Sequence, residues 1–92
     1  MSSPIIRTSR QRRAIEALVK YGKVSSRDIG RIAGVLNPPE LMAALRRNGW
    51  KWTCSLTEVL DRDGHICRPG QYSLLPESLE AAKNMVEADG HG

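Results

Sequence analysis

The chain has 92 residues, and 14 Lys or Arg against 10 Asp or Glu give it a formal net charge of +4 at pH 7. A chain of this length forms one domain with a small core, because it buries only about 60–65% of the surface that its unfolded form exposes. No apolar run is long enough to span a bilayer and no signal-peptide core begins the chain. We therefore expect a cytoplasmic protein with reduced cysteines and no membrane partner.

The positive charge is unevenly distributed along the chain. Residues 76–92 contain four Asp or Glu and one Lys, whereas residues 1–75 contain 13 Lys or Arg and six Asp or Glu. A small domain with this excess attracts polyanions, nucleic acid first. A solvated basic surface that only keeps the protein in solution explains the charge equally well.

The first half of the chain predicts two helices separated by a short strand. Residues 1–8 are expected to form a flexible leader. A helix then follows over residues 9–21, with Thr or Ser at its start and Gly at its end. Residues 23–24 suit a short strand, and residues 25–33 suit a second helix that begins at a serine cap and stops at a glycine.

The stretch from Asn37 to Trp50 carries the clearest signals in the chain. Asn37, two prolines and Glu40 mark a capped helix start, and Gly49 marks the end. The residues expected on the buried stripe of this helix are Leu41, Met42 and Leu45.

The second half of the chain predicts a hairpin and a last helix. Alternating apolar residues predict a strand over residues 50–59, and an Asp-Gly turn signal ends residues 61–64. A returning strand over residues 65–75 contains a proline, which interrupts regular pairing. An acidic helix is expected over residues 76–88, followed by a disordered tail over residues 89–92.

A helix that ends Leu-Arg-Arg-Asn-Gly-Trp and runs directly into a hairpin resembles the winged helix-turn-helix domain of small bacterial and phage DNA-binding proteins. The resemblance covers roughly residues 9–75 and implies an α+β fold with a three-helix core, a β-hairpin wing and a C-terminal helix. It also implies that the helix ending at Arg47 enters the major groove of double-stranded DNA while the wing lies on the backbone. The expected function is that of a small transcriptional regulator.

The resemblance also indicates which residues would contact DNA. The helix that enters the groove would present Asn37, Glu40, Ala43, Arg46 and Arg47 to base edges. Phosphate or minor-groove contacts are expected from Arg12, Arg13, Arg27, Arg31, Arg62 and Arg68. For each arginine, simple exposure to solvent is the alternative.

A winged domain used as a protein-interaction module is the alternative function. The apolar surface of Pro39 and Ala43, Glu40 in a reading position and the acidic last helix favour it. The last helix also suggests a homodimer, in which two copies pair through it.

Other chemistry has little support in the sequence. Trp50 is expected in the core, and Trp52 is either a core residue or a platform for base stacking. Cys54, His65 and Cys67 lack the fourth ligand of a common zinc site, so no metal is expected. The two cysteines are expected to face each other across the hairpin. The chain has no phosphate-binding loop and no nucleophile motif, so we expect neither a cofactor nor an enzyme.

Overall fold

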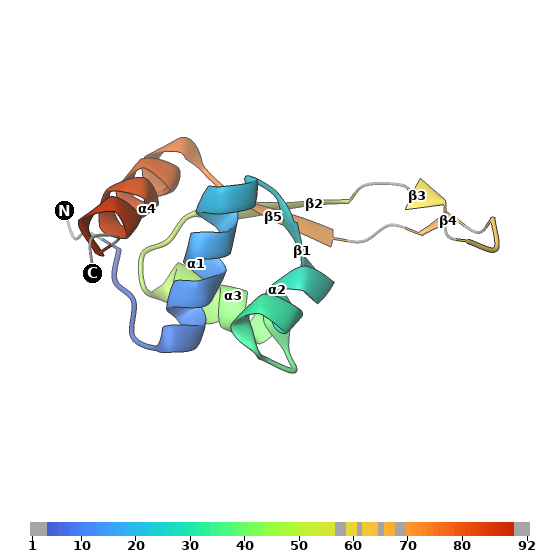
Figure 1. The fold of residues 1–92 in the computed structure, drawn as a ribbon, viewed down its shortest axis with the longest axis horizontal. Coiled ribbons are helices and arrows are strands. Elements are labelled where there is room, and N and C mark those ends of the chain that lie inside the picture. Colours follow the sequence, from blue (N-terminus) through green and yellow to red (C-terminus); the bar gives the residue numbers. More distant parts are fainter. Residues whose placement is uncertain (1–3, 57–58, 61, 65, 68–69, 90–92) are drawn as a thin grey trace.

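The computed structural model of the chain describes residues 4–56, 59–60, 62–64, 66–67 and 70–89. Within these residues the fold is α+β, with four helices, a three-stranded antiparallel sheet and a two-stranded extension (Figure 1). In chain order the elements are α1 (Ser9–Tyr21), β1 (Val24–Ser25), α2 (Ser26–Ala33), α3 (Pro38–Arg47), β2 (Trp52–Leu56), β3 (Val59–Leu60), β4 (Ile66–Cys67), β5 (Gly70–Leu74) and α4 (Pro76–Asp89).

The first three helices begin where the sequence predicts, because a polar side chain caps each of them. The side-chain oxygens of Thr8, Ser25 and Asn37 each accept the backbone N–H three residues further on, at 3.1, 3.1 and 3.4 Å. Such a bond satisfies one of the N–H groups that the first helical turn leaves without a partner. The first two helices end at Gly22 and Gly34, both with positive φ, as the glycine signals indicate.

Strand β5 lies at the centre of the three-stranded sheet. It pairs with β1 on one side and β2 on the other, both antiparallel. Tyr72 lies opposite Val24 on β1 and opposite Cys54 on β2. The short strand expected near residue 24 is therefore present, although it begins at Val24. Beyond this sheet the hairpin continues as β3 and β4, which project away from the helices (Figure 1).

The two cysteines do not face each other across the hairpin, so that prediction is wrong. Cys54 lies opposite Tyr72, and Cys67 lies opposite Val59. The cause is the register, which is symmetric about the turn at residues 62–64. Cys54 lies nine residues before the middle of this turn and Cys67 only four residues after it. The Asp-Gly turn signal is confirmed at Gly64, which has a φ of +81°.

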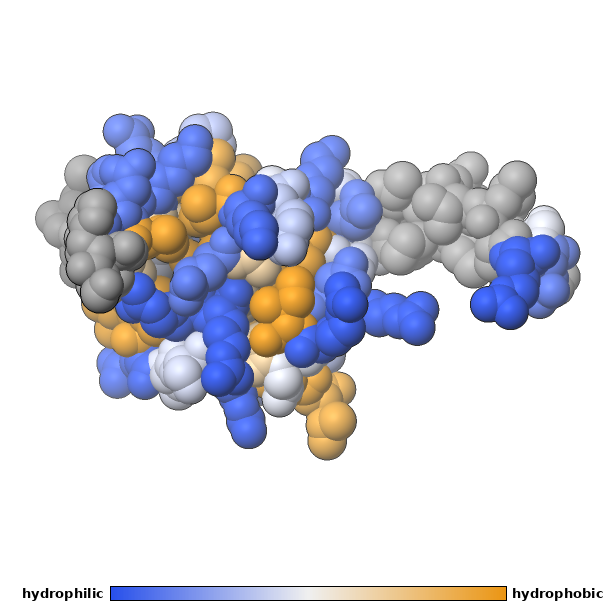
Figure 2. Space-filling model, in the orientation of Figure 1, coloured by the Kyte–Doolittle hydropathy of each residue, from blue (hydrophilic) through white to orange (hydrophobic). Residues whose placement is uncertain are grey.

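The core lies between the helices and the inner face of the sheet. The largest fully buried side chains are Trp50, Ile15, Leu18, Ile29, Met42 and Leu45. This confirms both the buried stripe predicted for α3 and the core position of Trp50. Helix α4 covers one side, with Ala82 fully buried and Leu79 and Met85 partly buried against the core. Figure 2 shows hydrophilic residues over most of the visible surface, with apolar residues between them.

The segment just before α1 is attached to the end of α3. The N–H of Ile5 donates to the carbonyl oxygen of Asn48 at 3.0 Å, and Trp50 Nε1 donates to the carbonyl oxygen of Ile5 at 2.8 Å. The Asn48 side chain donates to Oε1 of the buried Gln11 at 3.0 Å. The expected leader is therefore hydrogen-bonded to the domain from Ile5 onward.

A comparison of two glycines tests this attachment. Gly49 has a φ of +100°, and a Cβ there would lie 3.2 Å from Pro4 Cα, whereas Gly34 has a φ of +74° and its Cβ position would lie 4.0 Å from the end of the flexible Arg13 side chain. Alanine at either site costs about 1–2 kcal/mol for the positive φ. We expect Gly49→Ala to lose about 1 kcal/mol more, because its methyl group displaces Pro4. Urea unfolding measures both losses, and equal losses would contradict the attachment.

Candidate nucleic-acid interface

The turn between α2 and α3 brings the two helices close together. Four residues, 34–37, join them. The N–H groups of Gly34 and Val35 both donate to the carbonyl oxygen of Gly30, at 2.9 and 3.0 Å. A Cβ at Gly30 would lie 3.0 Å from Pro38 Cγ and 3.1 Å from the Val35 carbonyl oxygen. The missing side chain of Gly30 therefore allows α3 to start directly beside α2.

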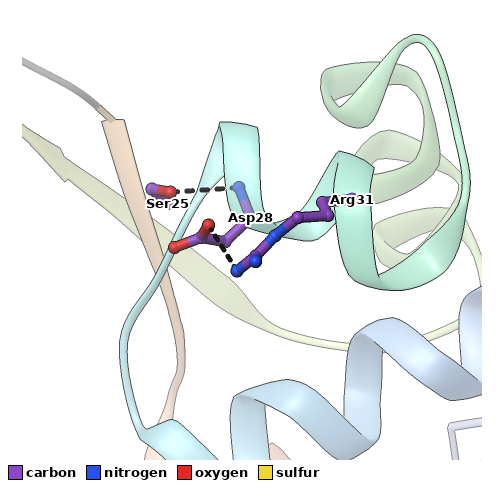
Figure 3. Close-up of polar contacts among 3 residues, drawn as sticks. All are labelled: Ser25, Asp28 and Arg31. Atoms are coloured by element: carbon purple, nitrogen blue, oxygen red, sulfur yellow. Dashed lines mark hydrogen bonds and ion pairs between the residues drawn. The ribbon is translucent and has the colours of Figure 1, made fainter.

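The start of α2 is held by Asp28 (Figure 3). Its N–H donates to Ser25 Oγ at 3.1 Å, and its carboxylate oxygen Oδ1 accepts from Arg31 Nη2 at 3.1 Å. The Arg31 side chain is still 76% exposed, so other N–H groups of its guanidinium face solvent. Because Asp28 compensates its charge, Arg31 attracts a phosphate less strongly than an arginine without an acidic neighbour.

Helix α3 presents a polar face to solvent. Asn37, Glu40 and Arg47 are exposed on this face, and Ala43 is half-buried. Arg47 Nη2 lies 3.9 Å from Glu40 Oε1, and the two side chains are 66% and 70% exposed. An ion pair this exposed contributes about 0–1 kcal/mol, so Arg47 can exchange Glu40 for another anion at little cost.

Arg46 points to the sheet rather than along this face. Its Cζ lies 3.8 Å from the centroid of the Trp52 ring, and its Nη2 donates to the carbonyl oxygen of Trp52 at 3.1 Å. Trp52 Nε1 in turn donates to the carbonyl oxygen of Met42 at 2.8 Å. These contacts direct the Arg46 guanidinium to Trp52 instead of to the base edges that it was expected to contact. They also occupy one face of Trp52, for which base stacking was the alternative to a core role, and the sequence did not predict them.

Arg12 and Arg13 are neighbours on α1 with different surroundings. Arg12 Nε lies 3.3 Å from Glu16 Oε1. Arg13 is exposed, and its Nη1 lies 4.0 Å from the Cβ position of Gly34, in the turn that leads into α3. Of the two, Arg13 is therefore placed beside the α2–α3 unit.

The remaining arginines of the predicted site are spread over a long distance. Arg27 on α2 and Arg62 in the hairpin turn are exposed, and neither forms an ion pair with another described residue. Arg68 lies outside the described residues. Because the hairpin turn lies far from α1 (Figure 1), the positive side chains do not form one compact patch.

A shallow cleft lies between the starts of α1 and α3. Arg10 of α1, Glu40 of α3 and Leu36 of the turn line it, together with neighbouring residues of the same segments. The Leu36 side chain is fully exposed, at 105% of its reference area. Leu36 lies beside the half-buried Val35 and Ala44 of the same cleft, and exposed apolar residues that are grouped occur at protein-binding surfaces more often than single ones do.

Other kinds of site receive no support from the described residues. Among them, no three His, Cys, Asp or Glu residues gather closely enough to hold a metal ion. His65 and His91 lie outside the described ranges. None of the helices in the described part of the chain is long and apolar enough to cross a membrane.

No protein-family model matches the chain, and no curated protein is significantly similar to it. What the chain binds is therefore inferred from its own residues and their geometry.

The close approach at Gly30 gives a direct test of the α2–α3 geometry. Alanine is a better helix former than glycine by about 1 kcal/mol, so propensity alone predicts that Gly30→Ala stabilises the protein. We expect a loss of about 1–2 kcal/mol instead, because the new methyl group meets a rigid proline ring and a backbone carbonyl. Thermal unfolding followed by circular dichroism measures the sign, and a stabilised variant would contradict this geometry.

Proposed function

We propose that the chain is a winged helix-turn-helix protein that binds double-stranded DNA. In this proposal α3 enters the major groove, and the hairpin from β2 to β5 is the wing that lies along the backbone. The observation that carries the proposal is the position of α3, whose polar face is open to solvent directly before the projecting hairpin. The pairing of β1 with the returning strand β5 supports the winged form of the motif.

The distribution of charge supports a polyanionic partner. Residues 7–31 contain eight Lys or Arg and two Asp or Glu, whereas α3 contains two Arg and one Glu. Most of the attraction would therefore come from α1 and α2, which suits contacts with phosphates. Since phosphate contacts carry no sequence information, affinity would depend strongly on salt and only weakly on sequence.

Base readout would rest on a small set of α3 residues. Arg47 suits a guanine edge, and the Ala43 methyl group suits the methyl group of thymine. The side-chain oxygen of Asn37 caps α3, so this residue would offer a base only its amide N–H groups. Glu40 suits the amino group of cytosine but repels phosphates. A reader with so few contacts fits a small transcriptional regulator of bacterial or phage type, acting in the cytoplasm where the DNA lies.

A protein-interaction module is the second candidate function, and the exposed Leu36 favours it. If this candidate function is correct, the chain should not bind duplex DNA even at low salt. The homodimer expected through α4 has less support, because Ala82 is buried and Leu79 and Met85 pack against the core of the same chain. The apolar face of α4 is therefore partly covered by the domain itself.

Fluorescence anisotropy with a mixed-sequence duplex tests the proposal. We expect affinity to fall steeply as salt rises from about 50 to 200 mM, because released counterions drive the binding. Arg27→Ala, at an expected phosphate contact, should weaken binding and reduce the slope of log K against log salt by about one. Arg47→Ala, at an expected base contact, should weaken binding with little change in this slope. Lys83→Ala removes one exposed charge from α4 and is the matched control, which should leave the slope unchanged. Duplex binding that is absent at low salt would contradict the proposal.

Glu40→Gln should strengthen binding to mixed-sequence DNA. The change removes a carboxylate from the face that approaches phosphates and releases Arg47 from its ion pair. An exposed pair contributes about 0–1 kcal/mol, so the gain should reach at most about fivefold. Glu80→Gln on α4 is the matched control, because it removes an exposed carboxylate from another surface. Weaker binding by Glu40→Gln, or an equal gain from both variants, would count against a DNA-facing α3.

A further inference from the structure

We propose that Arg46 is a positioning residue, whose contacts with Trp52 hold α3 at a fixed angle to the sheet and hairpin. It makes no DNA contact of its own. This inference rests on the proposed function, because the angle of α3 to the wing decides whether both can engage one duplex. It assigns to Arg46 a role different from that of its neighbour Arg47.

Two points on α3 are attached to the same indole. Trp52 Nε1 donates to the carbonyl oxygen of Met42 at 2.8 Å, and the Arg46 guanidinium lies 3.8 Å from the ring centroid. The Arg46 side chain also donates to the Trp52 carbonyl oxygen at 3.1 Å. Met42 and Arg46 are four residues apart, which is about 6 Å along the helix axis. Attachment at two separated points resists a change in tilt, which a single contact would permit.

The attachment continues from Trp52 into the centre of the sheet. The ring of Trp52 meets that of Tyr72 edge to face, with centroids 5.0 Å apart and an interplanar angle of 88°. Tyr72 is only 6% exposed and lies on the central strand β5, opposite residues of both β1 and β2. Through Trp52 and Tyr72, the contacts of Arg46 therefore link α3 to all three strands. These include β5, on which the hairpin returns to the domain.

The position of Arg46 on the helix separates it from the reading face. Residues four apart lie on the same side of a helix, so Arg46 shares a side with the fully buried Met42. Glu40 and Arg47 share a different side, as their ion pair shows. A guanidinium stacked on an indole and bonded to a carbonyl oxygen is also oriented toward the strand rather than toward a groove. Arg46 is therefore placed to support the reading face from beside it.

Duplex binding and its salt dependence distinguish positioning from direct contact. We expect Arg46→Ala to lower apparent affinity by about two- to tenfold, since losing a contact of cation–π strength reduces the population with α3 correctly oriented. The slope of log K against log salt should stay at the wild-type value, whereas Arg27→Ala, at an expected phosphate contact, reduces it. Arg46→Lys should not restore affinity, because an ammonium group lacks the planar surface that stacks on the ring.

Two further variants separate this role from a loss of stability. Trp52→Leu should weaken binding as much as Arg46→Ala does. The double variant should bind with the same affinity as either single variant, since each change removes the same Arg46–Trp52 contact. Leu79→Ala on α4 lowers stability away from α3 and should leave the affinity of the folded protein unchanged. Circular dichroism confirms that each variant is folded, and the Arg46 variants alone still decide the question if Trp52→Leu is not.

Three results would overturn the inference. They are a salt slope that falls by about one in Arg46→Ala, affinity restored by Arg46→Lys, and losses that add in the double variant. If the wild-type chain binds no duplex, the proposed function fails separately. Urea unfolding of the wild type, Arg46→Ala, Trp52→Leu and the double variant then tests the Arg46–Trp52 contact itself. We expect the losses in free energy of unfolding to be strongly non-additive, and additive losses would contradict the contact.

Discussion

The C-terminal end of α3 is held on two sides, and the rest of the structure depends on this attachment. On one side, Asn48 bonds to the buried Gln11, and the fully buried indole of Trp50 bonds to the Ile5 backbone. On the other side, Arg46 stacks on Trp52 at the start of β2. Carbonyl oxygens in the last turn of α3 accept from the N–H groups of Asn48, Gly49 and Trp50, so the helix end is satisfied without its solvent-exposed face. The outward face of α3 is consequently fixed in direction but free to bind.

In the proposed complex with DNA, attraction and recognition would come from different residues. Arg13 beside the α2–α3 turn, Arg27 on α2 and Arg62 in the hairpin turn are exposed, whereas the solvent-facing side of α3 carries the ion pair of Glu40 and Arg47. Exposed cations on several elements suit a long polyanion better than a small ligand. The same arrangement explains why strong sequence selectivity is not expected, because few of these side chains could reach base edges.

Local signals in the sequence predicted the helices and strands well, whereas they did not predict contacts between residues that are distant in the sequence. Helix starts followed from capping side chains at Thr8, Ser25 and Asn37, and the buried stripe of α3 followed from helical periodicity. The pairing of Cys54 with Tyr72 follows from a register symmetric about the turn at residues 62–64, so the Asp-Gly signal already conflicted with the expectation that Cys54 and Cys67 face each other. The contacts of Arg46 with Trp52 cross the junction between α3 and β2, where neither the helical periodicity nor the alternation of a strand predicts which side chains meet.

A titration of the isotope-labelled protein with a short duplex, followed by nuclear magnetic resonance, would show whether α3 and the hairpin turn contact DNA together. We expect the largest shifts at low salt in α3 around Asn37, Glu40 and Arg47 and in the hairpin turn around Arg62, while α4 stays unchanged. Shifts confined to α4, or no shifts at all, would contradict DNA binding through α3.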